Sequence, residues 1–218
     1  MAKNLSNKNK LFITFEGPDG CGKSTIAKKV YDYLSKLYKN KVVLTREPGG
    51  KENAIAEDIR NILLNHKEYN IQHNAEALLF AASRAQHVND FIIPHLKKGH
   101  IVLCDRYIHS SLVYQGYVSN LGINKILEIN KFAIKNTMPN LVILIMLEPK
   151  KCIERIRQNT RNMNRLDYQS FDIQKKVYSG YQLLIKKFPN VIKPVNGDQT
   201  VDNVFKEVLK IINKYVKK

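Results

Sequence analysis

Residues 17–25, Gly17-Pro18-Asp19-Gly20-Cys21-Gly22-Lys23-Ser24-Thr25, decide the fold of this chain. They match the P-loop pattern G-x-x-x-x-G-K-[ST]. Glycines at these positions let backbone N–H groups approach phosphate oxygens without a Cβ in the way. Lys23 places a positive charge at the β- and γ-phosphates, and the Ser24 hydroxyl can ligate Mg²⁺. The stretch therefore predicts a nucleoside triphosphate site.

The residues on either side of this loop support the prediction. Leu11–Phe15 reads as a short buried strand, and the stretch 26–38 carries apolar residues at helical spacing, namely Ile26, Val30, Leu34 and Leu37. A strand, a glycine loop and a helix in this order aim the helix N-terminus at a phosphate group.

Short apolar runs alternate with longer helical patterns along the rest of the chain. We expect strands at Leu11–Phe15, Lys41–Thr45, Ile101–Cys104, Leu141–Leu147 and Val191–Pro194. We expect helices at Thr25–Tyr38, Ala54–Asn65, Ala75–Leu96, Lys125–Lys135, Lys150–Arg157, Ile173–Phe188 and Val201–Val216. Strands without polar alternation are typical of sheets covered on both faces. The predicted fold is α/β, with a five-stranded parallel sheet flanked by helices.

Domain organisation follows from length and local composition. The chain of 218 residues predicts a single domain over residues 11–218, preceded by a disordered basic tail at residues 1–10. The polar, arginine-bearing stretch 158–169 resembles a surface loop, and we expect a lid at about residues 155–169.

Composition excludes some function classes. The longest apolar run, Leu141–Leu147, is much shorter than the roughly 18–20 residues that a membrane span needs, so no membrane partner is expected. The first ten residues are polar and do not resemble a secretory signal. Cys21, Cys104 and Cys152 are far apart, which favours reduced thiols and a cytoplasmic location over disulfides or a zinc site.

The net charge of +17 can indicate a surface dedicated to polyanions such as nucleic acids, or a generally basic, solvated surface. The lysines are spread along the whole chain, which indicates a solvated basic surface, so no nucleic-acid partner is expected.

The arginines are few and are candidates for tasks that need a planar, bidentate group. They are Arg46, Arg60, Arg84, Arg106, Arg155, Arg157, Arg161 and Arg165. Arg60 follows a helical pattern and can be interpreted as a surface or ion-pair residue.

Three short motifs are predicted to lie near the P-loop. Asp105-Arg106 follows a strand, and the carboxyl ends of parallel strands face the ligand crevice. Asp105 can hold Mg²⁺ or its waters there, and Arg106 can clamp an acceptor phosphate. The stretch 46–50, Arg-Glu-Pro-Gly-Gly, follows a second strand and places Arg46 and Glu47 at the same edge of the predicted sheet. Phe80 and Arg84 share one helix face, where the ring can stack on a base while the guanidinium donates to a base carbonyl.

Four segments together resemble one family, the thymidylate kinases. The matching segments are Phe15-Glu-Gly-Pro-Asp-Gly-Cys-Gly-Lys-Ser-Thr25, Thr45-Arg-Glu-Pro-Gly-Gly50, Leu79-Phe-Ala-Ala-Ser-Arg84 and Asp105-Arg-Tyr-Ile-His-Ser-Ser-Leu-Val-Tyr-Gln-Gly116. The resemblance extends over nearly the whole chain. It implies a P-loop nucleoside monophosphate kinase fold, ATP and Mg²⁺ as cofactors, dTMP as substrate and a homodimer.

The resemblance also implies roles for individual residues. For dTMP these residues are Asp19, Arg46, Glu47, Pro48, Phe80, Arg84, Arg106, Ser111, Tyr114 and Gln115. Within this set, Phe80 would stack on thymine, Arg84 would donate to a thymine carbonyl and Tyr114 would lie beneath the sugar. For ATP they are residues 17–25 with Arg155, and for Mg²⁺ they are Ser24 and Asp105. The catalytic residues implied are Lys23, Arg106, Arg161 and Asp19.

Members of the family differ in the source of the arginine that meets charge on the transferring phosphoryl group. None of the variable P-loop positions, residues 18–21, is basic here. This resembles the bacterial type, in which the lid donates the arginine. We expect Arg161 to serve the phosphates and Arg155 to lie near the adenine, while Arg157 and Arg165 can hold the lid to the body.

The sequence leaves two other functions open. A deoxynucleoside kinase would phosphorylate a neutral sugar hydroxyl and needs a base instead of a phosphate clamp, which the pair Arg46 and Arg106 argues against. A nucleotide-dependent nucleic-acid-binding module would use the basic surface and would show steeply salt-sensitive binding.

Overall fold

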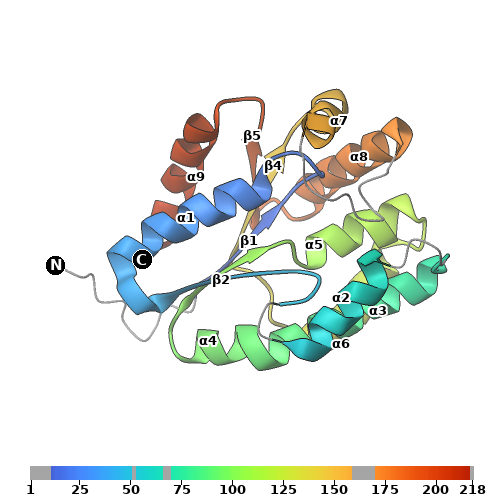
Figure 1. The fold of residues 1–218 in the computed structure, drawn as a ribbon, viewed down its shortest axis with the longest axis horizontal. Coiled ribbons are helices and arrows are strands. Elements are labelled where there is room, and N and C mark those ends of the chain that lie inside the picture. The colour runs from blue at the N-terminus through green and yellow to red at the C-terminus, as the bar shows by residue number, and fades with distance from the viewer. Residues whose placement is uncertain (1–10, 51–52, 66–69, 159–169, 217–218) are drawn as a thin grey trace.

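The computed structural model describes residues 11–50, 53–65, 70–158 and 170–216. Its centre is a sheet of five parallel strands in the order β2-β3-β1-β4-β5 (Figure 1). The strands are β1 (Leu11–Glu16), β2 (Val42–Arg46), β3 (Ile101–Asp105), β4 (Leu141–Met146) and β5 (Ile192–Asn196). This order confirms the predicted parallel α/β sheet.

Alternating side chains of the sheet enter two different hydrophobic cores. Ile13 and Phe15 on β1 face the core that contains α1 (Lys23–Tyr38) and α9 (Val201–Val216). Phe12 on the same strand faces the other core, built with α6 (Ile123–Ile134) and α8 (Phe171–Lys187). Since both faces are covered, apolar residues follow one another along each central strand.

The remaining helices cluster around the carboxyl ends of the strands and along one side of the sheet (Figure 1). They are α2 (Ala54–Asn65), α3 (His73–His87), the π-helical turn η2 (Val88–Ile92), α4 (Ile93–Lys97), α5 (Ile108–Ser111), the π-helical turn η3 (Leu112–Val118) and α7 (Pro149–Gln158). A short 3-10 turn, η1 (Lys39–Lys41), links α1 to β2.

Two helical segments differ from the sequence-based expectation. The expected helix Ala75–Leu96 is a helical run interrupted by η2, just before Pro94 on α4, whose nitrogen cannot donate a helical hydrogen bond. The helical segment formed by α5 and η3 was not expected as an element. Its mixed polar and aromatic residues and Gly116 lack a clean apolar stripe.

Some predictions lie outside the described residues. These are the disordered tail at 1–10 and most of the lid, because residues 159–169 are not described. The first residues of the expected lid, including Arg155 and Arg157, form the last turn of α7. Among the described residues, the structure contains no helix that is both long and apolar enough to cross a membrane.

Candidate active site

The P-loop connects the end of β1 to the start of α1, as its sequence predicts. Gly22 has φ of +93°, in the left-handed region, and a Cβ built there would meet no atom within 4 Å. The loop therefore opens onto free space at the N-terminus of a 16-residue helix. Such an arrangement of backbone N–H groups and helix dipole favours phosphate.

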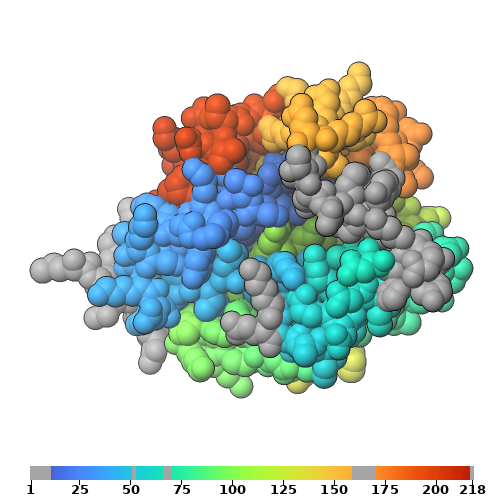
Figure 2. All heavy atoms as spheres, viewed as in Figure 1, coloured from blue at the N-terminus to red at the C-terminus, as the bar shows by residue number. Residues whose placement is uncertain are grey.

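Two clefts meet at the P-loop, and Asp19, Lys23 and Ser24 line both of them. The first cleft has a volume of about 330 Å³ and the second about 480 Å³. Figure 2 shows the face of the molecule on which the blue atoms of α1, the yellow-orange atoms of α7 and the teal atoms of α2 are all visible. The phosphate-binding loop is thus shared by two separate spaces.

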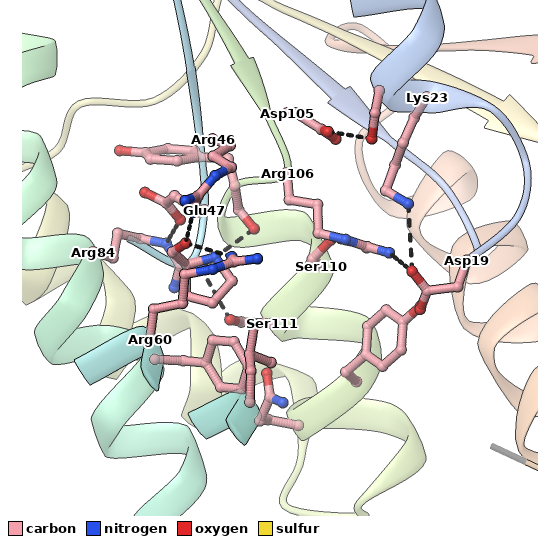
Figure 3. Close-up of a pocket in the computed structure, with 17 residues that line it drawn as sticks. Asp19, Lys23, Arg46, Glu47, Arg60, Arg84, Asp105, Arg106, Ser110 and Ser111 are labelled. Carbon is pink, nitrogen blue, oxygen red and sulfur yellow. Dashed lines mark hydrogen bonds and ion pairs between the residues drawn. The ribbon is translucent and has the colours of Figure 1, made fainter. Parts of the chain in front are cut away.

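The first cleft is lined by all ten of the residues expected to bind dTMP. It is lined by Asp19, Lys23, Ser24, Arg46, Glu47, Pro48, Arg60, Leu64, Phe80, Arg84, Asp105, Arg106, Tyr107, Ser110, Ser111, Tyr114 and Gln115 (Figure 3). Three sequence motifs therefore converge, from the ends of β2 and β3 and from one face of α3.

Arg106 lies on the floor of this cleft in a constrained conformation. Its φ is +68°, which is unusual for a residue with a side chain, and its backbone N–H donates to Phe15 O at 2.9 Å. The guanidinium donates to Asp19 Oδ1 at 2.5 Å and to Ser110 Oγ at 2.8 Å (Figure 3). Tyr114 donates its hydroxyl to Asp19 Oδ2 at 2.8 Å. These contacts fix the direction of the Arg106 fork before any substrate arrives.

The electrostatics of the shared corner follow from these contacts. Burial by itself raises the pKa of the Asp19 carboxyl, but the positive charges of Arg106 and Lys23 outweigh burial and hold that pKa well below its usual range. Lys23 Nζ lies 3.5 Å from Asp19 Oδ1. Asp19 therefore stays ionised and orients both cations.

Arg46 and Arg60 form a second cationic group at the other end of the cleft. Arg46 donates to Pro48 O at 2.9 Å and to Glu57 Oε2 at 3.0 Å, and Arg60 donates to Pro48 O at 2.8 Å. Burial and the neighbouring charge of Arg46 lower the pKa of Arg60 to about 10. Two guanidinium groups thus line the cleft, and both donate to the carbonyl oxygen of Pro48.

Arg60 is half-buried and lines the first cleft, so it does more than the surface or ion-pair role that its sequence pattern suggested. It lies on the same side of α2 as the buried residues Ala56, Leu63 and Leu64. The signal was present in the sequence: Arg60 follows Ala56 by four residues, which places both on one helix face.

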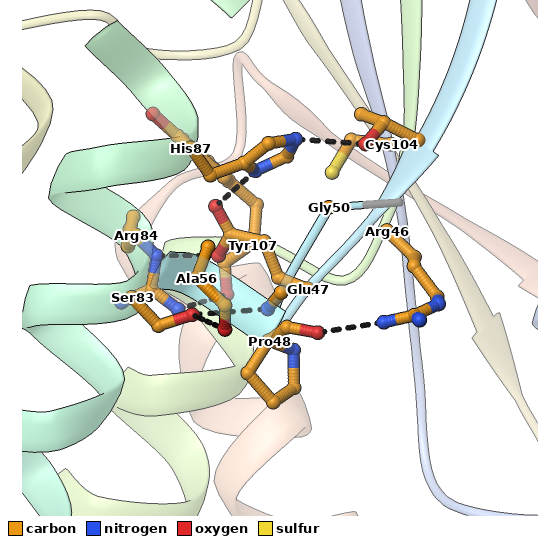
Figure 4. Close-up of polar contacts among 12 residues, drawn as sticks. Arg46, Glu47, Pro48, Gly50, Ala56, Ser83, Arg84, His87, Cys104 and Tyr107 are labelled. Atoms are coloured by element: carbon orange, nitrogen blue, oxygen red, sulfur yellow. Dashed lines mark hydrogen bonds and ion pairs between the residues drawn. The ribbon is translucent and has the colours of Figure 1, made fainter. Parts of the chain in front are cut away.

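Arg84 is held by a buried polar network. Its Nε donates to Glu47 Oε2 at 2.6 Å, its other nitrogens donate to Ser111 Oγ at 3.1 Å and to Asn130 Oδ1, and its side chain is 2% exposed. His87 Nδ1 lies 3.2 Å from Glu47 Oε1, and its Nε2 lies 2.7 Å from Thr45 Oγ1 (Figure 4). Sequence reasoning did not single out His87, although its place three residues after Arg84 puts both on one helix face.

The residues available for a metal ion lie at the shared corner. Ser24 Oγ donates to Asp105 Oδ2 at 2.5 Å, while Asp105 Oδ1 is buried with no hydrogen-bond partner among the described residues. A hydroxyl and a carboxylate with a free oxygen are the ligand types that Mg²⁺ takes in phosphate sites. The donor set at Ser24 and Asp105 therefore fits Mg²⁺.

The second cleft begins at the other side of the P-loop. It is lined by residues 19–26, by Arg155 and Ile156 of α7, by Gly197, Gln199 and Thr200 between β5 and α9, and by Val201 and Val204 at the start of α9. Arg155 donates to Gly197 O at 3.1 Å, which joins α7 to that stretch. Arg161, the arginine expected to serve the phosphates, lies outside the described residues.

Fold and site together define a P-loop kinase of nucleoside monophosphates. A family model described as thymidylate kinase matches residues 15–208. The thymidylate kinase of Clostridium novyi (strain NT) is 46% identical over 200 residues, covering 90% of this chain and 95% of that protein. The one from Anoxybacillus flavithermus (strain DSM 21510 / WK1) is 46% identical over 209 residues, covering 95% and 99%.

A solved structure is also similar. The crystal structure of thymidylate kinase from Ehrlichia chaffeensis superposes with a TM-score of 0.76 at 31% identity, covering 94% of this chain and 99% of that one. This chain belongs to the thymidylate kinase family.

Proposed function

We propose that this chain transfers the γ-phosphoryl group of ATP to dTMP and releases ADP and dTDP. The observation that carries the proposal is the meeting of two clefts at Asp19, Lys23 and Ser24. A kinase with two nucleotide substrates needs one space for each, with the phosphates between them. Membership of the thymidylate kinase family supports dTMP as the acceptor.

ATP occupies the second cleft in this proposal. Residues 17–25 bind its phosphates and Lys23 contacts the β- and γ-phosphates. Arg155, which lines that cleft beside Gly197, lies near the adenine. Ser24 and Asp105 hold Mg²⁺, which when bound neutralises phosphate charge that the arginines do not reach.

Charge and shape within the first cleft suit a nucleoside monophosphate. Arg106 with Arg46 and Arg60 offers guanidinium forks to the acceptor phosphate. Phe80, which is 9% exposed at the cleft wall, stacks on the base, and Arg84 donates to its carbonyl. Tyr114, tied through its hydroxyl to Asp19, lies under the sugar.

Catalysis in this arrangement is positioning combined with charge stabilisation. The acceptor phosphate is already anionic at neutral pH, so no strong general base is required. Asp19 orients Arg106 and Lys23, which hold the two phosphate groups toward one another. Arg161 adds positive charge to the transferring group from the lid, in which we include about residues 155–169.

The alternatives fit the geometry less well. A deoxynucleoside kinase would place a neutral hydroxyl among Arg46, Arg60 and Arg106, leaving their charges without an anion. A nucleic-acid-binding module would leave the arginine-lined acceptor cleft without a use. The family relationship favours neither.

Assembly and location are further parts of the proposal. Helices α2, α3 and α6 lie together (Figure 1) and carry exposed large apolar side chains, namely Ile55, Ile62, Leu78 and Phe132. Phe132 is 90% exposed, and apolar surface of this kind marks protein interfaces. We propose that these helices pair in a homodimer, which light scattering tests by mass. Three buried free cysteines suit the reducing cytoplasm.

A coupled ADP-release assay across a panel of nucleoside monophosphates tests the proposed function. We expect dTMP to give the highest kcat/KM and dCMP to be a poor substrate. Arg84 donors facing the cytosine amino group would leave both without acceptors, at a cost of about 1–3 kcal/mol. Equal kcat/KM for dTMP and dCMP would contradict this assignment.

A further inference from the structure

The side chain of Gln115, in the acceptor cleft, is held by a hydrogen bond to Glu76 on α3. Its side-chain Nε2 donates to Glu76 Oε1 at 3.0 Å. Both side chains are buried, with Gln115 3% and Glu76 7% exposed. Gln115 lines the cleft, whereas Glu76 lies behind it.

Glu76 belongs to the same face of α3 as the two base-reading residues. It lies in the first turn of the helix, and Phe80 and Arg84 follow at intervals of four residues. Residues four apart lie one above the other on a helix. The helix therefore presents a stacking ring and a guanidinium to the cleft, and a carboxylate to the side chain of Gln115.

The contact fixes which end of the Gln115 amide faces the cleft. A carboxylate only accepts hydrogen bonds, so Gln115 must turn its NH₂ group toward Glu76. The amide is planar, so its carbonyl oxygen then points to the other side. The two ends of an amide have nearly the same shape, so shape alone does not decide which end faces the cleft. The hydrogen bond to Glu76 does decide it.

We propose that Glu76 is a positioning residue for base specificity: by holding the Gln115 amide, it presents a hydrogen-bond acceptor to the base edge and so selects thymine over cytosine. This inference rests on the proposed function, because it assumes a pyrimidine in the first cleft. Glu76 itself does not touch the substrate.

The hydrogen-bonding pattern of the two bases gives the reason. The edge of thymine carries a carbonyl that accepts and an N3–H that donates. Arg84 donates and the oriented Gln115 accepts, so the pair matches this edge. Cytosine carries an amino donor and an unprotonated N3 acceptor, the reverse pattern. Each of its groups would face a like partner, and buried groups left unpaired are costly.

The variant Glu76→Gln tests the proposal. It keeps the size of the side chain but can accept or donate, which frees Gln115 to turn over. We expect the ratio of kcat/KM for dTMP to that for dCMP to fall about tenfold or more, through both a loss for dTMP and a gain for dCMP. The KM for ATP should stay within about twofold. Glu128→Gln on the exposed side of α6, where Glu128 pairs only with Lys131 among the described residues, is the matched control.

A double variant separates orientation from folding. Glu76→Gln combined with Gln115→Glu exchanges donor and acceptor, so that position 115 again presents an acceptor oxygen to the base. We expect this exchange to restore at least part of the selectivity for dTMP that the single variant loses. Damage to packing alone would not be repaired by it, and thermal unfolding of each variant reports on that damage.

The outcomes keep the inference distinct from the proposed function. If the unaltered protein does not prefer dTMP to dCMP, the proposed function fails. If it does prefer dTMP but Glu76→Gln keeps the ratio within twofold, the inference about Glu76 is wrong. The same holds if the single variant does not fold and the double variant folds without selectivity. Should neither variant fold, Glu76 serves the fold itself and the inference is also wrong.

Discussion

At the scale of single residues, two buried groups near the site carry opposite dependences on pH. His109 on α5 is 1% exposed, with neither ring nitrogen hydrogen-bonded among the described residues, and burial lowers its pKa to about 3. Burial raises the pKa of Glu16 to about 7, against the opposing effects of its bond from Ser110 and the charge of Arg106. Glu16 also accepts from the N–H of Tyr107 at 2.8 Å, which joins β1 to the segment after β3.

The signs follow from which state binds more protons. Unfolded His109 binds a proton below its ordinary pKa of about 6.5, while the folded residue does so only below about 3, so its contribution to stability is lost as pH falls through this window. Glu16 does the reverse: the folded carboxyl keeps its proton up to about pH 7, and that contribution is lost as pH rises from about 4.5 to 7. The two effects oppose each other between about pH 4.5 and 6.5, where the two windows overlap.

The variant His109→Leu tests the contribution of the buried histidine to the pH dependence of stability. In the unaltered protein, the buried neutral histidine lowers the free energy of unfolding at pH 5 relative to pH 7.5. We expect this difference between the two pH values to become about 2 kcal/mol more favourable to pH 5 when the histidine is removed. Urea unfolding at the two pH values measures it. The same pH dependence in the variant and in the unaltered protein would show that His109 is not held neutral by burial.

At the scale of elements, the turn after β2 and the end of α3 form one unit that supports Arg84. The ring of His87 lies against Gly50, whose φ is +151°, and a Cβ at Gly50 would lie 2.5 Å from the ring carbon Cδ2 (Figure 4). His87 is fully buried and contacts Thr45 and Glu47, so it has little room to move. The turn, the histidine and the arginine that reads the base are therefore coupled.

Gly50→Ala tests this coupling. We expect a loss of about 1–3 kcal/mol in the free energy of unfolding from backbone strain. We also expect a several-fold higher KM for dTMP with little change in the KM for ATP, because the displaced ring disturbs Glu47. Gly122→Ala is the matched control, since its φ is +92° but a Cβ there would meet nothing within 4 Å. The coupling is wrong if both variants lose stability and neither changes the KM for dTMP.

The sequence predicted the sheet and the P-loop because their signals are local. Buried strands and a helix after a glycine loop are decided by neighbouring residues, so β1, α1 and the parallel direction of the strands followed from pattern alone. The order of the strands in the sheet was not predicted. The cleft arginines were found through motifs at strand ends. Helical spacing places Arg60, His87 and Glu76 on helix faces that carry other site residues, but it did not identify them as site residues. The residues that they contact lie 12, 40 and 39 positions away, so these contacts could not be read from a local pattern.

At the scale of the whole molecule, two clefts of different character share one phosphate loop. The first is rich in arginines and holds the base-reading side chains of α3, while the second opens beside Arg155 and the start of α9. Their only shared residues among those described are the three at the P-loop, Asp19, Lys23 and Ser24. Phosphoryl transfer at this corner therefore requires that one nucleotide brings its terminal phosphate to a second nucleotide, and that the second carries a phosphate of its own for the arginines.

Transfer of label from ATP carrying a radioactive γ-phosphate measures this requirement most directly. With dTMP present, we predict that labelled dTDP forms in step with ADP, and that thymidine in place of dTMP takes up no label. Lys23→Ala, which removes the charge shared by both clefts, should abolish transfer while thermal unfolding stays near that of the unaltered protein. Label on thymidine, or ADP release that yields only inorganic phosphate in the presence of dTMP, would contradict the account.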